Sequence, residues 1–218
     1  MLLTETEVRV LGSLIEKQIT TPEYYPLTLN ALTLACNQKN NRHPVTTLSE
    51  AEVEQALDSL REKNLAYVFH GSTSRVPKFK HVMPEIYHLS PPELAVTCAL
   101  MLSGAQTVGE IRGRAARLYE FSGLGEVEET LHALSVKDPE SLVTRLPRLA
   151  GQKEARFAHL LCGEVKIEPA EEGALAARSS RHSSDPGKVD LLAQRIENLE
   201  GEVEGLRRQF EEFKKQFE

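Results

Sequence analysis

The sequence contains little of what a membrane-spanning, disulfide-bonded or zinc-binding protein needs. No apolar run reaches the roughly 18 residues that a bilayer requires, and we expect no secretion signal because no basic-then-apolar segment opens the chain. The three cysteines, Cys36, Cys98 and Cys162, lie far apart and form no CxxC pair. An odd number at such spacing argues against a disulfide framework or a zinc site. We therefore expect a cytoplasmic protein with reduced, buried thiols.

An excess of positive charge is also missing, which bears on nucleic-acid binding. The 218 residues carry 26 Lys and Arg against 32 Asp and Glu, a formal net charge of −6. Residues 1–90 contain nine basic against ten acidic side chains, and residues 91–165 contain eight against ten. A strongly basic domain is the clearest sequence sign of nucleic-acid binding. Any such binding must therefore come from local basic segments.

Catalytic motifs are absent as well. The seven histidines are scattered, and the sequence has no His-x3-His pair, no activated serine or cysteine motif and no inward carboxylate pair. His70 and His81 could face each other across a hairpin, but two histidines without a third ligand predict a metal site only weakly. The motif Gly123-Leu-Gly125 lacks the Lys-Ser/Thr of a phosphate-binding loop and is interpreted as a turn. We expect no enzyme, no cofactor and no metal.

The stretch from Thr47 to Phe69 organises the first half of the chain. Ser49 and Glu52 have capping-box spacing, which predicts that a helix begins here. Apolar residues recur behind them at helical spacing, and the strand-favouring run 65–69 follows almost directly. A third helix that runs into a β-hairpin is the order of a winged helix. The apolar stripe consists of Val53, Ala56, Leu57 and Leu60.

The neighbouring segments complete a first module over residues 1–89. Thr4 or Thr6 is expected to cap a first helix that ends near Gln18. Pro26 is expected in the first turn of a second helix, since its fixed φ suits that position. The predicted hairpin consists of a strand at 65–69, a wing at 70–81 and a second strand at 85–89.

Two segments of this module are basic and free of acids. They supply Lys39 and Arg42 from a polar loop at 37–44, and Arg75, Lys78 and Lys80 from the wing. Such side chains hold a protein on a nucleic-acid backbone, although solvated loops have the same composition. The third helix carries four acids that repel phosphates, so we expect no direct base readout from it. These acids are Glu50, Glu52, Glu54 and Asp58.

Several short sequence motifs, taken together, resemble those of a known family. In chain order they are RVLGSLIEK at 9–17, TTP at 20–22, YPLTLNAL at 25–32, ACNQKNNR at 35–42, RLPR at 145–148, GQKE at 151–154 and HLL at 159–161. In this order they closely resemble the YceH-like family of uncharacterised bacterial proteins. The resemblance implies two winged-helix domains in tandem in a cytosolic protein. It implies no established activity.

Residues 90–165 repeat the pattern of the first module. A helix is expected from Pro91 to Gly104, and a capping box at Thr107 and Glu110 predicts the next one. The spacing of Val53, Leu57 and Leu60 recurs in Val127, Leu131 and Leu134, and strands follow at 142–146 and 156–161. The basic side chains of this module indicate either a solvated face or a patch for phosphate or an acidic partner. They include Arg112, Arg114, Arg148 and Lys153.

The composition changes after residue 165. Residues 166–187 are rich in small and polar side chains, which is typical of a flexible linker. Residues 188–218 then carry apolar residues at alternating steps of three and four, the seam of a coiled coil whose a and d residues favour a parallel dimer. Packing of this helix against its own modules is the alternative. The seam consists of Val189, Leu192, Ile196, Leu199, Val203, Leu206 and Phe210, followed by two more phenylalanines.

These observations predict an α+β, mainly helical protein with two tandem winged-helix domains and a C-terminal coiled-coil helix. Its expected function is binding of double-stranded DNA through basic wings, in regulation, as a cytoplasmic homodimer without a membrane segment. The alternative is an interaction module that binds protein and no nucleic acid, which the acidic third helix and the net charge favour. Basic wings on one face would support the first reading, and dispersed or neutralised ones the second.

Overall fold

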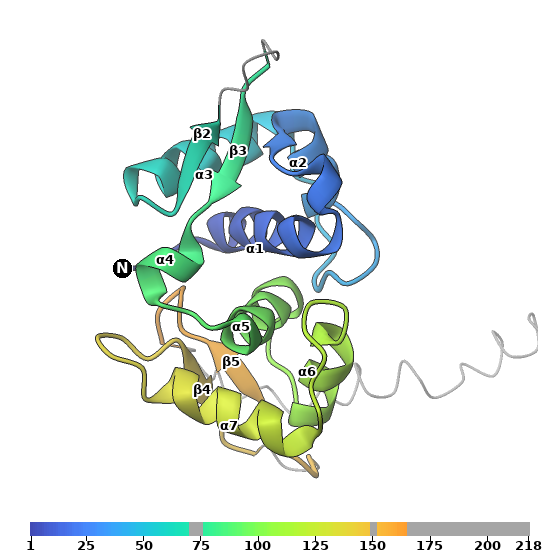
Figure 1. Cartoon of the computed structure of the whole chain (residues 1–218), viewed down its shortest axis with the longest axis vertical. Coiled ribbons are helices and arrows are strands. Elements are labelled where there is room, and N and C mark those ends of the chain that lie inside the picture. The colour runs from blue at the N-terminus through green and yellow to red at the C-terminus, as the bar shows by residue number, and fades with distance from the viewer. Residues whose placement is uncertain (70–75, 149–151, 165–218) are drawn as a thin grey trace, which may run out of the picture. The chain divides into compact units, whose positions relative to one another are not determined.

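The computed structural model describes residues 1–69, 76–148 and 152–164. These residues belong to one compact unit, Met1–Val165. Arg75, the linker at 166–187 and the coiled coil at 188–218 with its seven seam residues lie outside the described residues. The fold is α+β with two small antiparallel sheets (Figure 1). None of the helices found in the described ranges is long and apolar enough to cross a membrane.

In the first half of the unit, the described residues 1–69 and 76–89 form four α-helices, a short 3-10 helix and a three-stranded sheet. In chain order its elements are α1 (Glu5–Thr20), η1 (Pro22–Tyr24), β1 (Leu27–Thr28), α2 (Leu29–Cys36), α3 (Glu50–Glu62), β2 (Ala66–Phe69), β3 (Lys78–His81) and α4 (Met83–Tyr87). The sheet order is β1-β3-β2, and both pairs are antiparallel.

In the second half, the described residues 90–148 and 152–164 form three helices and a two-stranded sheet. Its elements are α5 (Pro91–Ser103), α6 (Val108–Ala115), α7 (Leu124–Ser135), β4 (Val143–Arg145) and β5 (Phe157–His159). Strands β4 and β5 pair in an antiparallel arrangement in which Thr144 lies opposite Ala158. Both strands fall inside the ranges expected from the sequence.

The predicted capping boxes at Ser49 and Thr107 are confirmed, and Thr4, one of the two expected caps of the first helix, forms a third box that was not predicted. Thr4 Oγ1 accepts a hydrogen bond from the amide of Glu7 at 3.2 Å, and the Glu7 carboxylate accepts from the amide of Thr4. Ser49 opens α3 and Thr107 opens α6 with the same reciprocal bonds. Each box satisfies amides that a helix N-terminus leaves without an internal partner.

Three local predictions are wrong. Pro26 precedes β1, and Thr28 caps α2 instead. The second strand of the first hairpin is Lys78–His81, whereas residues 83–87 form α4. Pro84 explains this difference, since it has no amide for a strand ladder and its φ suits a first helical turn. Gly123 is the N-cap residue of α7, which places Gly125 inside the helix.

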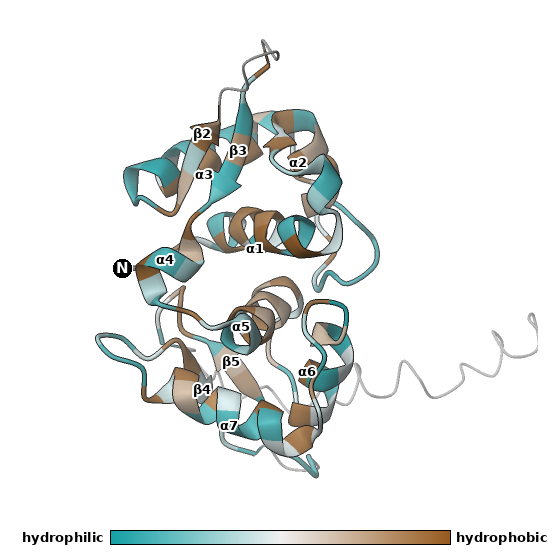
Figure 2. Ribbon diagram, viewed as in Figure 1, coloured by the Kyte–Doolittle hydropathy of each residue, from teal (hydrophilic) through white to brown (hydrophobic). Residues whose placement is uncertain are grey.

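Helices α1 and α5 pack against each other at the centre of the unit (Figure 1). Every residue of α5 from Glu93 to Ser103 is buried, and the helix is apolar along most of its length (Figure 2). A Cβ added to Gly12 of α1 would lie 3.0 Å from a methyl carbon of Leu102 on α5. The glycine therefore permits the close approach of the two helices.

Two of the three cysteines follow the prediction. Cys36 and Cys98 are buried, and burial raises the pKa of the Cys98 thiol to about 12. Cys162 is exposed, so the expectation of three buried thiols is wrong at this position.

Candidate nucleic-acid interface

The two faces of the first β-hairpin carry different side chains. Strand β2 pairs with β3 so that Tyr67 lies opposite Lys80 and Phe69 lies opposite Lys78. Neighbours along a strand point to opposite faces, so the remaining residues of both strands face inward. Of these, Ala66, Phe79 and His81 are buried. We call Tyr67, Phe69, Lys78 and Lys80 the outer sheet face.

The outer sheet face combines exposed aromatic rings with lysines. Tyr67 is 41% exposed and Phe69 is 38% exposed. The Nζ atom of Lys80 lies 5.0 Å from the centroid of the Phe69 ring, a distance at which a cation is attracted to the ring. Within the described part of the chain, neither lysine forms an ion pair with a carboxylate. The face therefore keeps its positive charge and can contact phosphate.

Of the two nucleic-acid contacts predicted in the loop before α3, one side chain is exposed and the other is buried. Lys39 is exposed, but Arg42 is only 4% exposed. The Arg42 guanidinium donates to both carboxylate oxygens of Glu16 and to the carbonyl oxygen of Ala35. Its hydrogen-bonding groups are turned into the protein, so the expectation that Arg42 contacts nucleic acid is corrected.

Some of the basic side chains in the second half already form hydrogen bonds or ion pairs within the protein. Arg114 donates to Ser103 Oγ at 3.0 Å. Arg156 donates to the carbonyl oxygen of Ala105 at 2.9 Å and pairs with Glu110 at 3.5 Å. The other predicted contacts of this half are exposed; they are Arg112, Arg148 and Lys153.

The two hairpins lie at opposite ends of the described unit. In Figure 1 the strands β2 and β3 lie above α1, whereas β4 and β5 lie below α1, next to α5 and α7. Lys78 and Lys80 therefore do not share a surface with Arg148 and Lys153. The basic residues found by sequence form separate patches, the arrangement that favours the protein-binding alternative, so contact with DNA requires one hairpin to act alone.

Helix α3 presents its acids to solvent, as its sequence predicts. Glu50, Glu52, Glu54 and Asp58 are all exposed, while the apolar stripe of α3 packs toward α1 and α2. Hydrogen bonds from the backbone and side chain of Ser49 lower the pKa of Glu52, which therefore stays ionised. This surface repels phosphate and could contact a basic protein segment.

No metal centre is found in the ranges that the structure describes, where no three His, Cys, Asp or Glu side chains come together. His81 is buried on the inner face of the sheet, and burial lowers its pKa to about 4. His70, the other half of the weak histidine pair, lies outside these ranges.

Sequence reasoning missed the two aromatic residues of the outer sheet face. In the sequence, Tyr67 and Phe69 stand out only as members of the strand-favouring run 65–69. The available signal was their spacing of two, which places both on the face opposite the buried Ala66. Their neighbours Lys78 and Lys80 have the same spacing.

Comparisons with known proteins agree on one family. Residues 3–153 match the model of DUF480, described as a protein of unknown function. A UPF0502 protein of Geotalea uraniireducens is 51% identical over 227 residues, covering 100% of this chain and 99% of the relative. A UPF0502 protein of Opitutus terrae is 55% identical over 78% of this chain and 74% of its own length. One of Pectobacterium atrosepticum is 46% identical over 95% of both chains.

Proposed function

The chain belongs to the DUF480 family of uncharacterised bacterial proteins, also named UPF0502, and from this premise we propose that it binds double-stranded DNA through its first β-hairpin. The contacts are made by the outer sheet face, and the protein acts in transcription regulation in the cytoplasm. The observation that carries this proposal is the pair of lysines, Lys78 and Lys80, beside the exposed rings of Tyr67 and Phe69.

The order of elements supports a winged-helix module in each half. Helices α1, α2 and α3 precede the hairpin β2–β3, and helices α5, α6 and α7 precede the hairpin β4–β5. In such a module the hairpin is the wing, which lies along the nucleic-acid backbone. Phosphate contacts of this kind fix the position of a protein without reading sequence. The acidic α3 then stays out of the groove.

Both hairpins carry basic side chains that no described carboxylate neutralises, and the exposed rings of Tyr67 and Phe69 distinguish the first. Lys78 and Lys80 project from paired strands, and within the described residues no carboxylate neutralises them. In the second half, Arg156 is held by Ala105 and by Glu110 of α6. Each phosphate that a lysine neutralises releases a counterion, which makes binding favourable at low salt.

The test is fluorescence anisotropy of a labelled random duplex, titrated with the full chain at about 50 and about 200 mM salt. The variant K78A/K80A removes two charges from the outer sheet face, and R148A/K153A removes two from the opposite end. We expect K78A/K80A to weaken binding about tenfold or more at the lower salt, and R148A/K153A to change it less than about threefold. Equal losses in both variants would contradict the assignment to the first hairpin.

A second function is supported by the exposed carboxylates of α3. Glu50 and Glu54 form an acidic surface on α3, the helix whose counterpart in a helix-turn-helix protein reads bases, while Asp58 is paired with Arg61. This surface favours an adaptor that binds a basic protein segment and no nucleic acid. Failure of the chain to bind duplex DNA at the lower salt would favour this second function.

We also propose that residues 188–218 make the protein a homodimer. The proposal rests on the a and d pattern of the sequence alone. Light scattering of the full chain and of a chain that ends at residue 187 tests it. A dimer that becomes a monomer is the expected result, and an unchanged mass per particle would contradict it.

A further inference from the structure

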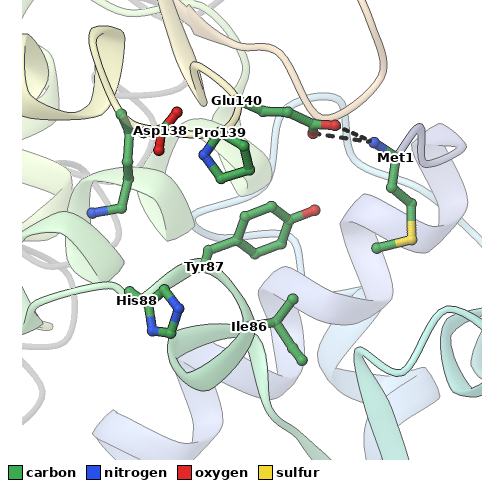
Figure 3. Close-up of a pocket in the computed structure, with 8 residues that line it drawn as sticks. Met1, Ile86, Tyr87, His88, Asp138, Pro139 and Glu140 are labelled. Carbon is green, nitrogen blue, oxygen red and sulfur yellow. Dashed lines mark hydrogen bonds and ion pairs between the residues drawn. The ribbon is translucent and has the colours of Figure 1, made fainter.

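A small cavity lies between the end of α4 and the segment that joins α7 to β4 (Figure 3). Its volume is about 170 Å³, similar to an engineered cavity of about 150 Å³ that holds benzene. Ile86, Tyr87 and His88 line it from the first half of the unit, and Asp138, Pro139 and Glu140 line it from the second. None of the residues of the outer sheet face lines this cavity.

The cavity has apolar walls and one hydroxyl without a partner. The Ile86 side chain, the Tyr87 ring and Pro139 supply the walls. The Tyr87 hydroxyl is buried and forms no hydrogen bond within the described residues. In Figure 3 this hydroxyl points toward the ion pair of Met1 with Glu140.

The charges around the cavity leave one carboxylate free. The amino group of Met1 contacts the two oxygens of Glu140 at 2.9 and 3.1 Å. Lys137 Nζ pairs with Glu93 at 2.8 Å. Both cations at the cavity are therefore neutralised. Asp138 forms no ion pair or hydrogen bond with any other described residue, and it gives the cavity a negative charge.

We propose that this cavity binds a small organic amine. The ammonium group pairs with Asp138, while an apolar body the size of a benzene ring packs against Ile86, Tyr87 and Pro139. The face of the Tyr87 ring attracts the same charge. A ligand held in this way touches both halves of the unit and stabilises their contact by mass action.

The position of Tyr87 connects the cavity to the first hairpin. Tyr87 ends α4, and only Val82 separates α4 from β3. The backbone amide of Val82 donates to the carbonyl oxygen of Leu65, which directly precedes β2. An amine in the cavity therefore contacts the helix that continues from one hairpin strand.

The probe is benzylamine, titrated into the untagged full chain and followed by nuclear magnetic resonance. Benzyl alcohol and benzoate have the same ring and test the charge. We expect benzylamine to bind saturably, with shifts at Tyr87 and His88, benzyl alcohol to bind at least about tenfold more weakly, and benzoate not to bind. Asp138→Asn should weaken benzylamine binding about tenfold or more. Glu128→Gln removes an exposed carboxylate of α7 and should leave binding unchanged.

Three results would overturn the proposal. The first is no saturable binding of benzylamine up to about 10 mM, which is weak for a ligand of this size in a matched site. The second is equal binding of benzoate, which would show that the negative charge of the cavity plays no part. The third is unchanged affinity in Asp138→Asn when its thermal stability matches that of the parent chain.

Discussion

Arg42 and Glu16 form a buried ion pair between a loop and the central helix α1. Arg42 Nη1 donates to Glu16 Oε1 at 3.0 Å, and Nη2 contacts the other carboxylate oxygen. Both side chains are almost fully buried. Arg117, which follows α6, contacts the same carboxylate from the second half. Burial alone would raise the pKa of Glu16, but Arg42 and Arg117 outweigh it and hold that pKa below its usual value.

We predict that Glu16→Gln destabilises the protein by about 3–5 kcal/mol, because it leaves a buried arginine without its counter-charge. Urea unfolding followed by circular dichroism measures the change. Asp58→Asn is the control, since Asp58 pairs with Arg61 at the surface and should cost less than about 1 kcal/mol. A loss below about 1 kcal/mol in Glu16→Gln would contradict a structural role for the pair.

Gly12→Ala should destabilise the contact between α1 and α5. The added Cβ would lie 3.0 Å from Leu102 Cδ2 and 3.3 Å from Met101 Cβ. Leu102 is fully buried, so the expected cost is about 1–3 kcal/mol. Gly113→Ala in α6 is the matched control, because its Cβ meets nothing within 4 Å. That change should stabilise the protein by about 0.5–1 kcal/mol. Thermal unfolding of both variants measures the two changes in stability. Equal effects would show that α1 and α5 are not closely packed in solution.

Stability should fall as the pH is lowered from about 6.5 to about 4. Burial lowers the pKa of His81 from its ordinary 6.5 to about 4, and that of His159 likewise. In this window the unfolded chain binds protons that the folded chain does not, so protonation favours unfolding. The full contribution is present above pH 6.5, and it amounts to roughly 3 kcal/mol for His81.

The variant His81→Asn tests this assignment. The amide oxygen of asparagine can replace Nδ1 of His81, which accepts a hydrogen bond from the amide of Met83 at 3.4 Å. The variant should lose less stability than the parent chain between pH 6.5 and 4. His132→Asn changes an exposed histidine and should follow the parent curve. Identical pH curves for His81→Asn and the parent would show that His81 does not titrate in this way.

If the chain binds DNA as proposed, the salt dependence of the affinity should report the number of lysine contacts. Each neutralised phosphate contributes about 0.9 to the slope of log K against log salt concentration. If Lys78 and Lys80 both contact phosphates, K78A/K80A should reduce the magnitude of this slope by about 2. Anisotropy titrations at four salt concentrations measure it. A weaker affinity with an unchanged slope would mean that the variant loses contacts other than phosphates.

The sequence alone determined the features that depend on neighbours along the chain. The capping boxes at Thr4, Ser49 and Thr107 join residues three apart, and the apolar stripe of α3 follows the helical repeat. Each is therefore fixed by local hydrogen bonds and by spacing. The same reasoning located strands β4 and β5 and showed that both hairpins are basic. The short motifs that carry the family resemblance, in the first three quarters of the chain, can also be recognised without knowing the fold.

Tertiary structure decided which of these side chains face solvent. Arg42 lies in a polar segment with the composition of a surface loop. Its side chain is nevertheless buried, because its partner Glu16 lies 26 residues earlier on the buried side of α1. The pairing of β2 with residues 78–81 placed Lys78 and Lys80 beside Tyr67 and Phe69. The separation of the two hairpins and the cavity beside Tyr87 depend on the packing of α1 against α5 and of α4 beside the segment before β4. Contacts between segments that are distant in sequence depend on shape and burial, which a local pattern does not encode.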